Sequence, residues 1–186
     1  MIQADIIIDA KGLACPMPIV RTKKAMNELK EGQVLQVQAT DRGSIADMEA
    51  WAESVGHQYI GTQEVDQVLY HYLRKCDNDD IEERLYEQTI TNEQLTAKLG
   101  EGGILLDVRE QAEYTFGHIA GAIHIALGDL DERHDELSHD QPIYVICRTG
   151  KRSDFAAQKL AKLGYAQVYN VLPGMQQWKD ELIQDV

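Results

Sequence analysis

The sequence predicts an α/β protein of two domains. Residues 1–75 are expected to form a two-layer β-α-β-α-β-β sandwich, and residues 89–186 a three-layer α/β/α domain with a mostly parallel sheet. A length of 186 residues suits two small domains better than one. Between them, residues 76–88 hold six acidic side chains, a composition that favours a solvated linker. On both sides, apolar runs of strand length alternate with helical patterns.

In the N-terminal domain the expected elements follow from local signals. An isoleucine-rich run predicts the first strand, and Pro16 and Pro18 open the first helix, since proline is favoured in the first helical turn. A capping box at residues 44–47 opens the second helix. Strands are expected over residues 4–9, 34–39, 57–62 and 65–74.

The C-terminal domain alternates strands with helices. A capping box at residues 91–94 opens its first helix, and Ser153 is the expected cap of a later one. Such alternation predicts a parallel sheet covered on both faces. Strands are expected over residues 103–108, 122–125, 143–146 and 166–172, and helices over 91–100, 111–116, 130–137, 153–163 and 174–183.

Composition limits the partners and the location. The net charge of −13 would repel nucleic acid and anionic lipid, so neither is expected as a ligand. The sequence has no apolar run of membrane-spanning length, and residues 1–11 do not resemble a signal peptide. Three widely spaced cysteines do not resemble a disulfide framework, which fits a reducing cytoplasm. His118 and His124 lack metal-ligand spacing, so no metal site is expected.

Cys147 is the strongest candidate for chemistry. It follows the apolar strand 143–146, at the carboxyl end where open α/β sheets place ligand sites. Arg148, Lys151 and Arg152 follow within five residues, and a helix then begins. Helix-start N–H groups and cations favour a thiolate. The alternative is a buried cysteine beside a solvated basic turn, but three clustered cations in an acidic chain favour the reactive interpretation.

The run Cys-Arg-Thr-Gly-Lys-Arg-Ser at residues 147–153 resembles the active-site loop of single-domain rhodaneses, sulfurtransferases that carry a persulfide on this cysteine. Residues 106–110, 114–123 and 173–178 match further landmarks of that family in the same order. The resemblance implies that Cys147 is catalytic. It also implies a donor-binding loop made of Arg148, Thr149, Gly150, Lys151, Arg152 and Ser153.

Loop length separates this resemblance from related enzymes. Four residues lie between Cys147 and Arg152, whereas similar arsenate reductases and cell-cycle phosphatases have five. The shorter loop resembles those that take a sulfane sulfur rather than a phosphate. A phosphatase or arsenate reductase is therefore disfavoured.

Cys15 is the second candidate. It lies just before the proline-started helix, with the positive end of the helix dipole over its sulfur. Position alone favours a reactive thiol and a small apolar residue equally. The pattern Asp9-x-x-Gly12-Leu13-x-Cys15-Pro16-x-Pro18 is similar to the signature of TusA-like (SirA/YedF-type) sulfur carriers, whose cysteine relays a persulfide to a partner protein. The resemblance implies that Cys15 is also catalytic.

Three other residues are expected to have no catalytic role. Cys76 stands before a run of carboxylates, which oppose a thiolate, and is interpreted as a surface thiol in the linker. Asp107 and Arg109 belong to the rhodanese pattern, yet a carboxylate that ends a buried strand more often braces loops.

Together these resemblances imply a two-cysteine sulfurtransferase. Cys147 would take sulfur from thiosulfate or a small persulfide and exchange it with Cys15 or with another thiol or protein acceptor. A cysteine persulfide is then the intermediate, and no cofactor is needed. The alternative that stays open is a non-catalytic persulfide carrier or adaptor, loaded by a desulfurase and delivering sulfur to a partner protein.

Overall fold

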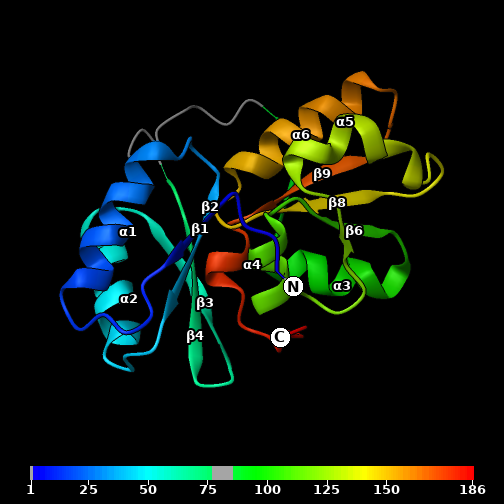
Figure 1. Cartoon of the computed structure of the whole chain (residues 1–186). Coiled ribbons are helices and arrows are strands. Elements are labelled where there is room, and N and C mark those ends of the chain that lie inside the picture. Colours follow the sequence, from blue (N-terminus) through cyan, green and yellow to red (C-terminus); the bar gives the residue numbers. More distant parts are fainter. Residues whose placement is uncertain (1, 77–85) are drawn as a thin grey trace. The chain divides into compact units, whose positions relative to one another are not determined.

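The computed structural model describes residues 2–76 and 86–186 (Figure 1). The chain divides into two compact units, which are described separately: the first contains residues 2–76 and the second residues 86–185. Of the expected linker, residues 77–85 lie outside the described residues. Within the described part of the chain, no helix is long and apolar enough to cross a membrane.

The first unit is a mixed four-stranded sheet with two helices on one face (Figure 1). Its strand order is β1-β2-β4-β3; β1 pairs in parallel with β2, and the other pairs are antiparallel. This confirms the predicted β-α-β-α-β-β order. The elements are β1 (Ile6–Asp9), α1 (Met17–Glu28), β2 (Val34–Ala39), α2 (Ser44–Ser54), β3 (Gln58–Val65) and β4 (Val68–Arg74).

The core of this unit lies between the helices and the sheet. Met26 of α1 and Met48 of α2 are almost completely buried against Leu35 and Val37 of β2. Full burial of one such side chain contributes roughly 2 kcal/mol of hydrophobic free energy. This packing fixes both helices on the sheet, and Cys15 lies just before the amino end of α1.

Two local predictions in the first unit were wrong. Gly43, not Ser44, is the N-cap of α2, and Ser44 makes no capping bond, because its hydroxyl contacts the Asp41 carbonyl and His71 instead. β3 runs further than expected, to Val65, and β4 begins later than expected, at Val68; the two strands meet at a two-residue turn, in which Asp66 and Gln67 both have positive φ. The usual asparagine–glycine signal for such a turn is missing from the sequence.

The second unit is a five-stranded, fully parallel sheet in the order β5-β9-β8-β6-β7. This confirms the predicted α/β architecture. Its strands are β5 (Thr89–Thr91), β6 (Ile104–Asp107), β7 (Ile123–His124), β8 (Ile143–Ile146) and β9 (Val168–Leu172). Its helices are α3 (Asn92–Glu101), α4 (Gln111–Phe116), α5 (Leu130–Arg133) and α6 (Lys151–Lys162), with short 3-10 helices at Leu127–Asp129, His134–Glu136 and Met175–Gln177.

Helices cover both faces of this sheet, with α5 and α6 on one side and α3 and α4 on the other (Figure 1). The central strand β8 supplies both cores, because successive side chains of a strand point to opposite faces. Ile143 and Val145 pack with Leu160 of α6, whereas Tyr144 and Ile146 belong to the cluster on the opposite face. Both helical layers of the predicted α/β/α architecture are therefore present.

The expected last helix, residues 174–183, was wrong. Only Met175–Gln177 is helical, as a 3-10 turn, and the chain then runs on without helix until Ile183 pairs with His118 in an isolated bridge. The N–H groups of Met175 and Gln176 bond to carbonyls of the loop after β8. These tertiary bonds, which the sequence pattern does not reveal, replace the start of an ordinary helix.

Candidate functional site

Cys147 lies at the carboxyl end of β8, only 1% exposed, directly before the turn into α6. Gly150 has a φ of 92° and forms the turn that starts this helix. Its N–H donates to Cys147 Sγ at 3.1 Å, and the Ser153 hydroxyl lies 3.3 Å from the same sulfur. The first N–H groups of any helix also lack partners within that helix. The sulfur is therefore held among hydrogen-bond donors at the positive end of α6.

Ser153 is not a helix cap, as the sequence suggested, but a fully buried residue in the first turn of α6. Its Oγ lies 2.6 Å from Asn170 Oδ1, and Asn170 Nδ2 donates to the Gly150 carbonyl at 3.1 Å. A hydroxyl has one proton and two lone pairs. Ser153 therefore donates to a Cys147 thiolate, or accepts from the thiol while donating to Asn170.

Arg152 is tied to the neighbouring helix α4. Its Nη1 and Nη2 donate to the two carboxylate oxygens of Glu113 at 2.6 and 2.9 Å, and the Glu113 side chain is 1% exposed. Burial lowers the pKa of Arg152, but the Glu113 carboxylate, together with Cys147 and Glu110, raises it well above the ordinary value. Arg152 therefore stays charged while it braces the loop against α4.

The rest of the predicted loop surrounds the thiol. Gly150 is buried, and Arg148, Thr149 and Lys151 are half-buried. Two cations of the loop thus keep part of their side chains in solvent, where they can attract an anion.

The segment after β9 is hydrogen-bonded to the backbone of this loop. Met175 N–H donates to the Cys147 carbonyl and Gln176 N–H to the Arg148 carbonyl, both at 2.9 Å. Gly174 has a φ of 90°, and a Cβ at this position would lie 2.5 Å from the Cys147 oxygen. No other residue type fits here without a shift of backbone. Because the backbone at Gly174 comes this close to the loop, the carbonyls of Cys147 and Arg148 accept hydrogen bonds from the segment after β9, away from the sulfur.

Sequence reasoning missed three residues of this site. Glu113 and Asn170 lie far from Cys147 in the sequence, and Gly174 was placed in a helix. Weak signals exist for two of them. Asn170 is a polar residue inside an apolar strand, and Glu113 completes a capping box with Glu110 at the start of α4.

Asp107 and Arg109 have the bracing role that was expected. Their side chains form a buried ion pair at 2.6 Å, and Arg109 also donates to the Gly117 carbonyl at 2.7 Å. His118 and His124 stack on Tyr114, with ring centroids 3.8 and 4.6 Å from it. In residues 2–76 and 86–186, no group of three His, Cys, Asp or Glu side chains is arranged to hold a metal ion.

Cys15 is exposed and lies just before α1. It lines a small hollow with Pro18, Ile19, Asp41, Ser44 and Asp47. A hydrogen bond to the Asp47 side chain, partial burial and the charges of Asp47 and Asp41 raise the pKa of the Cys15 thiol. The position before α1 left the reactivity of Cys15 open, and the carboxylates of Asp47, on α2, and of Asp41, in the loop before it, act against a thiolate.

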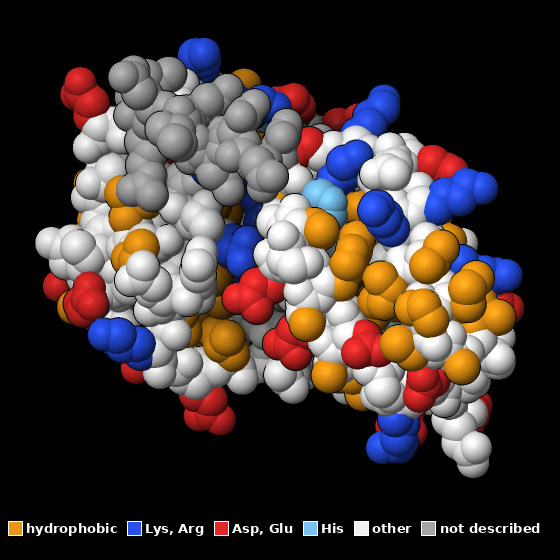
Figure 2. Space-filling model, turned by 90° about the vertical axis from the view of Figure 1, so that its left-hand side faces the viewer, with side chains coloured by type: hydrophobic (Ala, Val, Ile, Leu, Met, Phe, Trp, Pro, Cys, Tyr) orange, Lys and Arg blue, Asp and Glu red, His pale blue; other side chains and the backbone are white. Residues whose placement is uncertain are grey.

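The surface around Cys15 is partly apolar. Met17 and Val20 of α1 and Ile45 of α2 are exposed. Figure 2 shows the side of the molecule on which these two helices lie, and hydrophobic side chains gather on part of it. Exposed apolar patches of this kind often mark protein-binding surfaces.

Cys76 differs from the expected surface thiol. It lies two residues after the end of β4 and is half-buried, with its Sγ 3.4 Å from Arg74 Nη1. Its N–H points to His57 Nδ1 at 3.4 Å. This cysteine is therefore part of the ordered end of the first unit.

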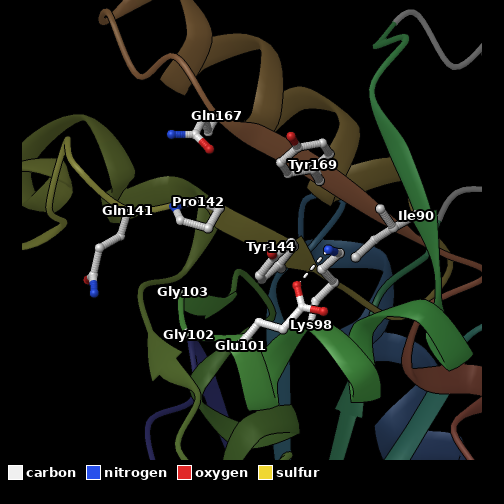
Figure 3. Close-up of a pocket in the computed structure, with 10 residues that line it drawn as sticks. All are labelled: Ile90, Lys98, Glu101, Gly102, Gly103, Gln141, Pro142, Tyr144, Gln167 and Tyr169. Carbon is white, nitrogen blue, oxygen red and sulfur yellow. Dashed lines mark hydrogen bonds and ion pairs between the residues drawn. The ribbon is translucent and has the colours of Figure 1, made fainter.

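A cavity of about 480 Å³ opens at the end of the parallel sheet opposite to Cys147, near the amino ends of β8 and β9 (Figure 3). The stacked rings of Tyr144 and Tyr169 and the Lys98–Glu101 ion pair form part of its wall. Cys147 lies at the carboxyl end of β8 and does not line this cavity. The cavity is therefore separate from the thiol site.

Comparison with known proteins covers both halves of the chain. The family model for the sulfurtransferase TusA matches residues 6–75, and the model for the rhodanese-like domain matches residues 91–181. The Bacillus subtilis protein named "Putative sulfur carrier protein YrkF" is 48% identical over 180 residues, which cover 96% of this chain and 97% of that protein. This chain belongs to the family of TusA–rhodanese fusion proteins.

Other relatives match one half of the fusion protein. The thiosulfate sulfurtransferase GlpE of Coxiella burnetii is 34% identical over 76 residues, 41% of this chain and 71% of that protein. A crystal structure of a rhodanese-like domain protein from Staphylococcus aureus is 29% identical, with a TM-score of 0.50, and covers 53% of this chain and 98% of that one. Both halves belong to sulfur-transfer families, so the fusion protein acts in sulfur transfer.

Proposed function

We propose that the fusion protein is a sulfurtransferase that loads sulfane sulfur from thiosulfate or a small persulfide onto Cys147 and exchanges it with Cys15. In this proposal residues 1–75 are the carrier domain, residues 76–88 the linker and residues 89–186 the rhodanese domain. The observation that supports it most is the pair of donors, Gly150 N–H and the Ser153 hydroxyl, that point at Cys147 Sγ at the start of α6.

In the loading step, the Cys147 thiolate attacks the outer sulfur of thiosulfate. The sulfur–sulfur bond of the donor breaks, sulfite leaves with the electron pair, and Cys147-S-S⁻ remains. Arg148 and Lys151, the two half-buried cations next in sequence, hold the anionic donor in place. The N–H groups at the start of α6 stabilise the new persulfide anion, and Arg152 adds its charge while it bonds to Glu113.

In the delivery step, an acceptor thiolate attacks the terminal sulfur of the Cys147 persulfide. The bond between the two sulfurs breaks and Cys147 leaves as a thiolate, which is the persulfide counterpart of thiol–disulfide exchange. Cys15 is exposed and is the acceptor carried on the same chain. Tethering gives two linked sites an effective concentration of order millimolar when the linker permits contact. A small thiol or a protein thiol is the acceptor outside the chain.

Two cysteine variants test this function. Cys147→Ser should abolish the release of sulfite from thiosulfate, because the attacking sulfur is gone. Cys15→Ser should keep that release and lose only onward transfer, measured as sulfur found on an acceptor protein. Sulfite release that stays undiminished in Cys147→Ser would contradict the proposal.

A second candidate function is a persulfide carrier without turnover of its own, loaded by a desulfurase. The exposed Met17, Val20 and Ile45 near Cys15 support it, since such a carrier needs a protein-binding surface. Steady-state assays separate the two. Turnover with thiosulfate and cyanide or a small thiol supports the enzyme, whereas sulfur loading only by a partner protein supports the carrier.

A further inference from the structure

The two reactive cysteines have opposite electrostatic surroundings. Cys147 Sγ faces hydrogen-bond donors, from Gly150 N–H at 3.1 Å and Ser153 Oγ at 3.3 Å. Cys15 lines a hollow with the carboxylates of Asp41 and Asp47. The first sulfur is placed to accept hydrogen bonds, while the second lies beside two carboxylates, which raise the pKa of its thiol.

This difference acts on the loaded form more than on the free thiol. A persulfide is a stronger acid than the thiol from which it forms, so a loaded cysteine is an anion near neutral pH. At Cys15, where the pKa of the thiol is raised, loading therefore replaces a neutral group with a negative charge, which the carboxylates of Asp41 and Asp47 destabilise. At Cys147, which attacks as a thiolate, loading only moves a negative charge to the outer sulfur, close to the positive end of α6.

Burial acts against this trend at Cys147, because desolvation disfavours any anion. The Gly150 and Ser153 bonds, the positive end of α6 and the charge of Arg152 all offset that cost. At Cys15 the exposed sulfur has little to gain from its surroundings, and the amino end of α1 is opposed by the carboxylates of Asp47, on α2, and of Asp41, in the loop before it.

We propose that Cys147 is the resting place of sulfane sulfur in this protein, and that Cys15 holds it only briefly, as a persulfide that readily donates. This inference rests on the proposed function, in which both cysteines carry sulfur. It adds a direction: at equilibrium, sulfur exchange between the two cysteines favours the persulfide on Cys147.

The exchange needs no oxidant. The Cys147 thiolate attacks the outer sulfur of Cys15-S-S⁻, and a new sulfur–sulfur bond forms at Cys147. The bond to Cys15 breaks, Cys15 leaves with the electron pair and takes a proton from solvent, and a neutral thiol then lies beside Asp47. A reaction that passes a persulfide sulfur to Cys15 can therefore supply sulfur to Cys147. Removal of the sulfur from Cys147 needs an acceptor thiol that forms a more stable persulfide.

Full-length variants that retain one reactive cysteine test this. Cys15→Ser and Cys147→Ser, each combined with Cys76→Ser, are equilibrated at neutral pH with a fixed mixture of glutathione and glutathione persulfide. Alkylation then stops exchange, and intact-protein mass spectrometry gives the loaded fraction. We expect an equilibrium constant for loading at least about tenfold larger at Cys147 than at Cys15, the effect of one unit of differential ionisation.

Matched charge variants identify the cause. In the variant that keeps Cys15, Asp47→Asn should raise loading several-fold, and Glu49→Gln should not. Glu49 is an exposed carboxylate on the same helix that does not line the hollow. Asp41→Asn should act in the same direction as Asp47→Asn, which keeps the test usable if the latter fails to fold.

The outcomes separate the inference from the function. Equal or stronger loading of Cys15 overturns the inference and leaves the two-cysteine function standing, since both sites carry sulfur. An equal effect of Asp47→Asn and Glu49→Gln overturns the electrostatic cause on which the inference is built. A Cys147 that never loads overturns the inference and the proposed function together.

Discussion

At the scale of single residues, the surroundings of a thiol matter more than its place at a helix start. Cys15 precedes α1, yet Asp47 on another helix raises the pKa of its thiol. Ser153 illustrates the same point. Its hydroxyl bonds to Cys147 and Asn170 rather than to its own helix. Chemistry at both sites is therefore set by groups distant in sequence.

Asp47→Asn should shift the alkylation of Cys15 to lower pH. The wild-type pKa is raised, so the thiol stays protonated to higher pH than an ordinary cysteine. Loss of the carboxylate removes the main cause of that shift and increases the thiolate fraction near neutral pH. The rate of iodoacetamide modification of Cys15 against pH, followed by peptide mass spectrometry, measures this. A midpoint that stays in place or rises would show that Asp47 does not hold the proton.

At the scale of elements, two contacts from outside the loop shape the Cys147 site. The segment that begins at Gly174 bonds to the loop carbonyls, and α4 supplies Glu113 to Arg152. Neither contact touches the sulfur. Both decide where the loop atoms lie, so their loss should affect catalysis and stability in different proportions.

Gly174→Ala should reduce sulfite release from thiosulfate on the order of 100-fold, as expected for a misplacement of about 1 Å. The new Cβ would overlap the carbonyl oxygen of Cys147, and the positive φ adds strain. Steady-state kinetics measure the loss. Gly128→Ala is the control, because a Cβ there meets open space. Equal activity of the two variants would mean that the loop tolerates the displacement.

Glu113→Ala should destabilise the rhodanese domain by roughly 3 kcal/mol, since it leaves the Arg152 charge largely buried without its carboxylate. Urea denaturation, followed by a probe in this domain, gives the change in the free energy of unfolding. Glu136→Ala is the control. It removes an exposed ion pair with Arg133, and such pairs contribute less than about 1 kcal/mol. A similar small change in both variants would rule out a bracing role for Glu113.

At the scale of the whole molecule, each hydrophobic cluster lies within one unit. Met48 belongs to the cluster of the first unit, and Leu160 to one of the two clusters in the second. The two halves thus have their own sources of stability, as expected for domains that occur as separate proteins.

Met48→Ala should destabilise the first unit by about 2–5 kcal/mol through the loss of buried contacts. Release of sulfite from thiosulfate should stay close to wild type, because Cys147 and its loop are in the other unit. Thermal unfolding and a sulfite assay on the same preparation measure both quantities. Parallel loss of activity and stability would show that the units depend on each other.

The sequence predicted those parts of the fold and site that depend on local pattern. The strand 143–146, the helix 111–116 and the capping box at residues 91–94 were placed correctly, because periodicity and capping are local. The helix expected at 174–183 failed because its first N–H groups bond to the Cys147 loop. The expected cap at Ser153 failed for a similar reason: its hydroxyl bonds to Asn170, which lies on β9.

The pleat of β8 has a further consequence. Ile143 and Val145 point to the α6 side, and Cys147 continues that alternation, so its sulfur reaches the amino end of that helix. Adding or deleting one residue in this strand would invert the phase and turn the sulfur toward the layer of α3. The alternation of side chains along this four-residue strand thus decides whether the thiol reaches its hydrogen-bond donors.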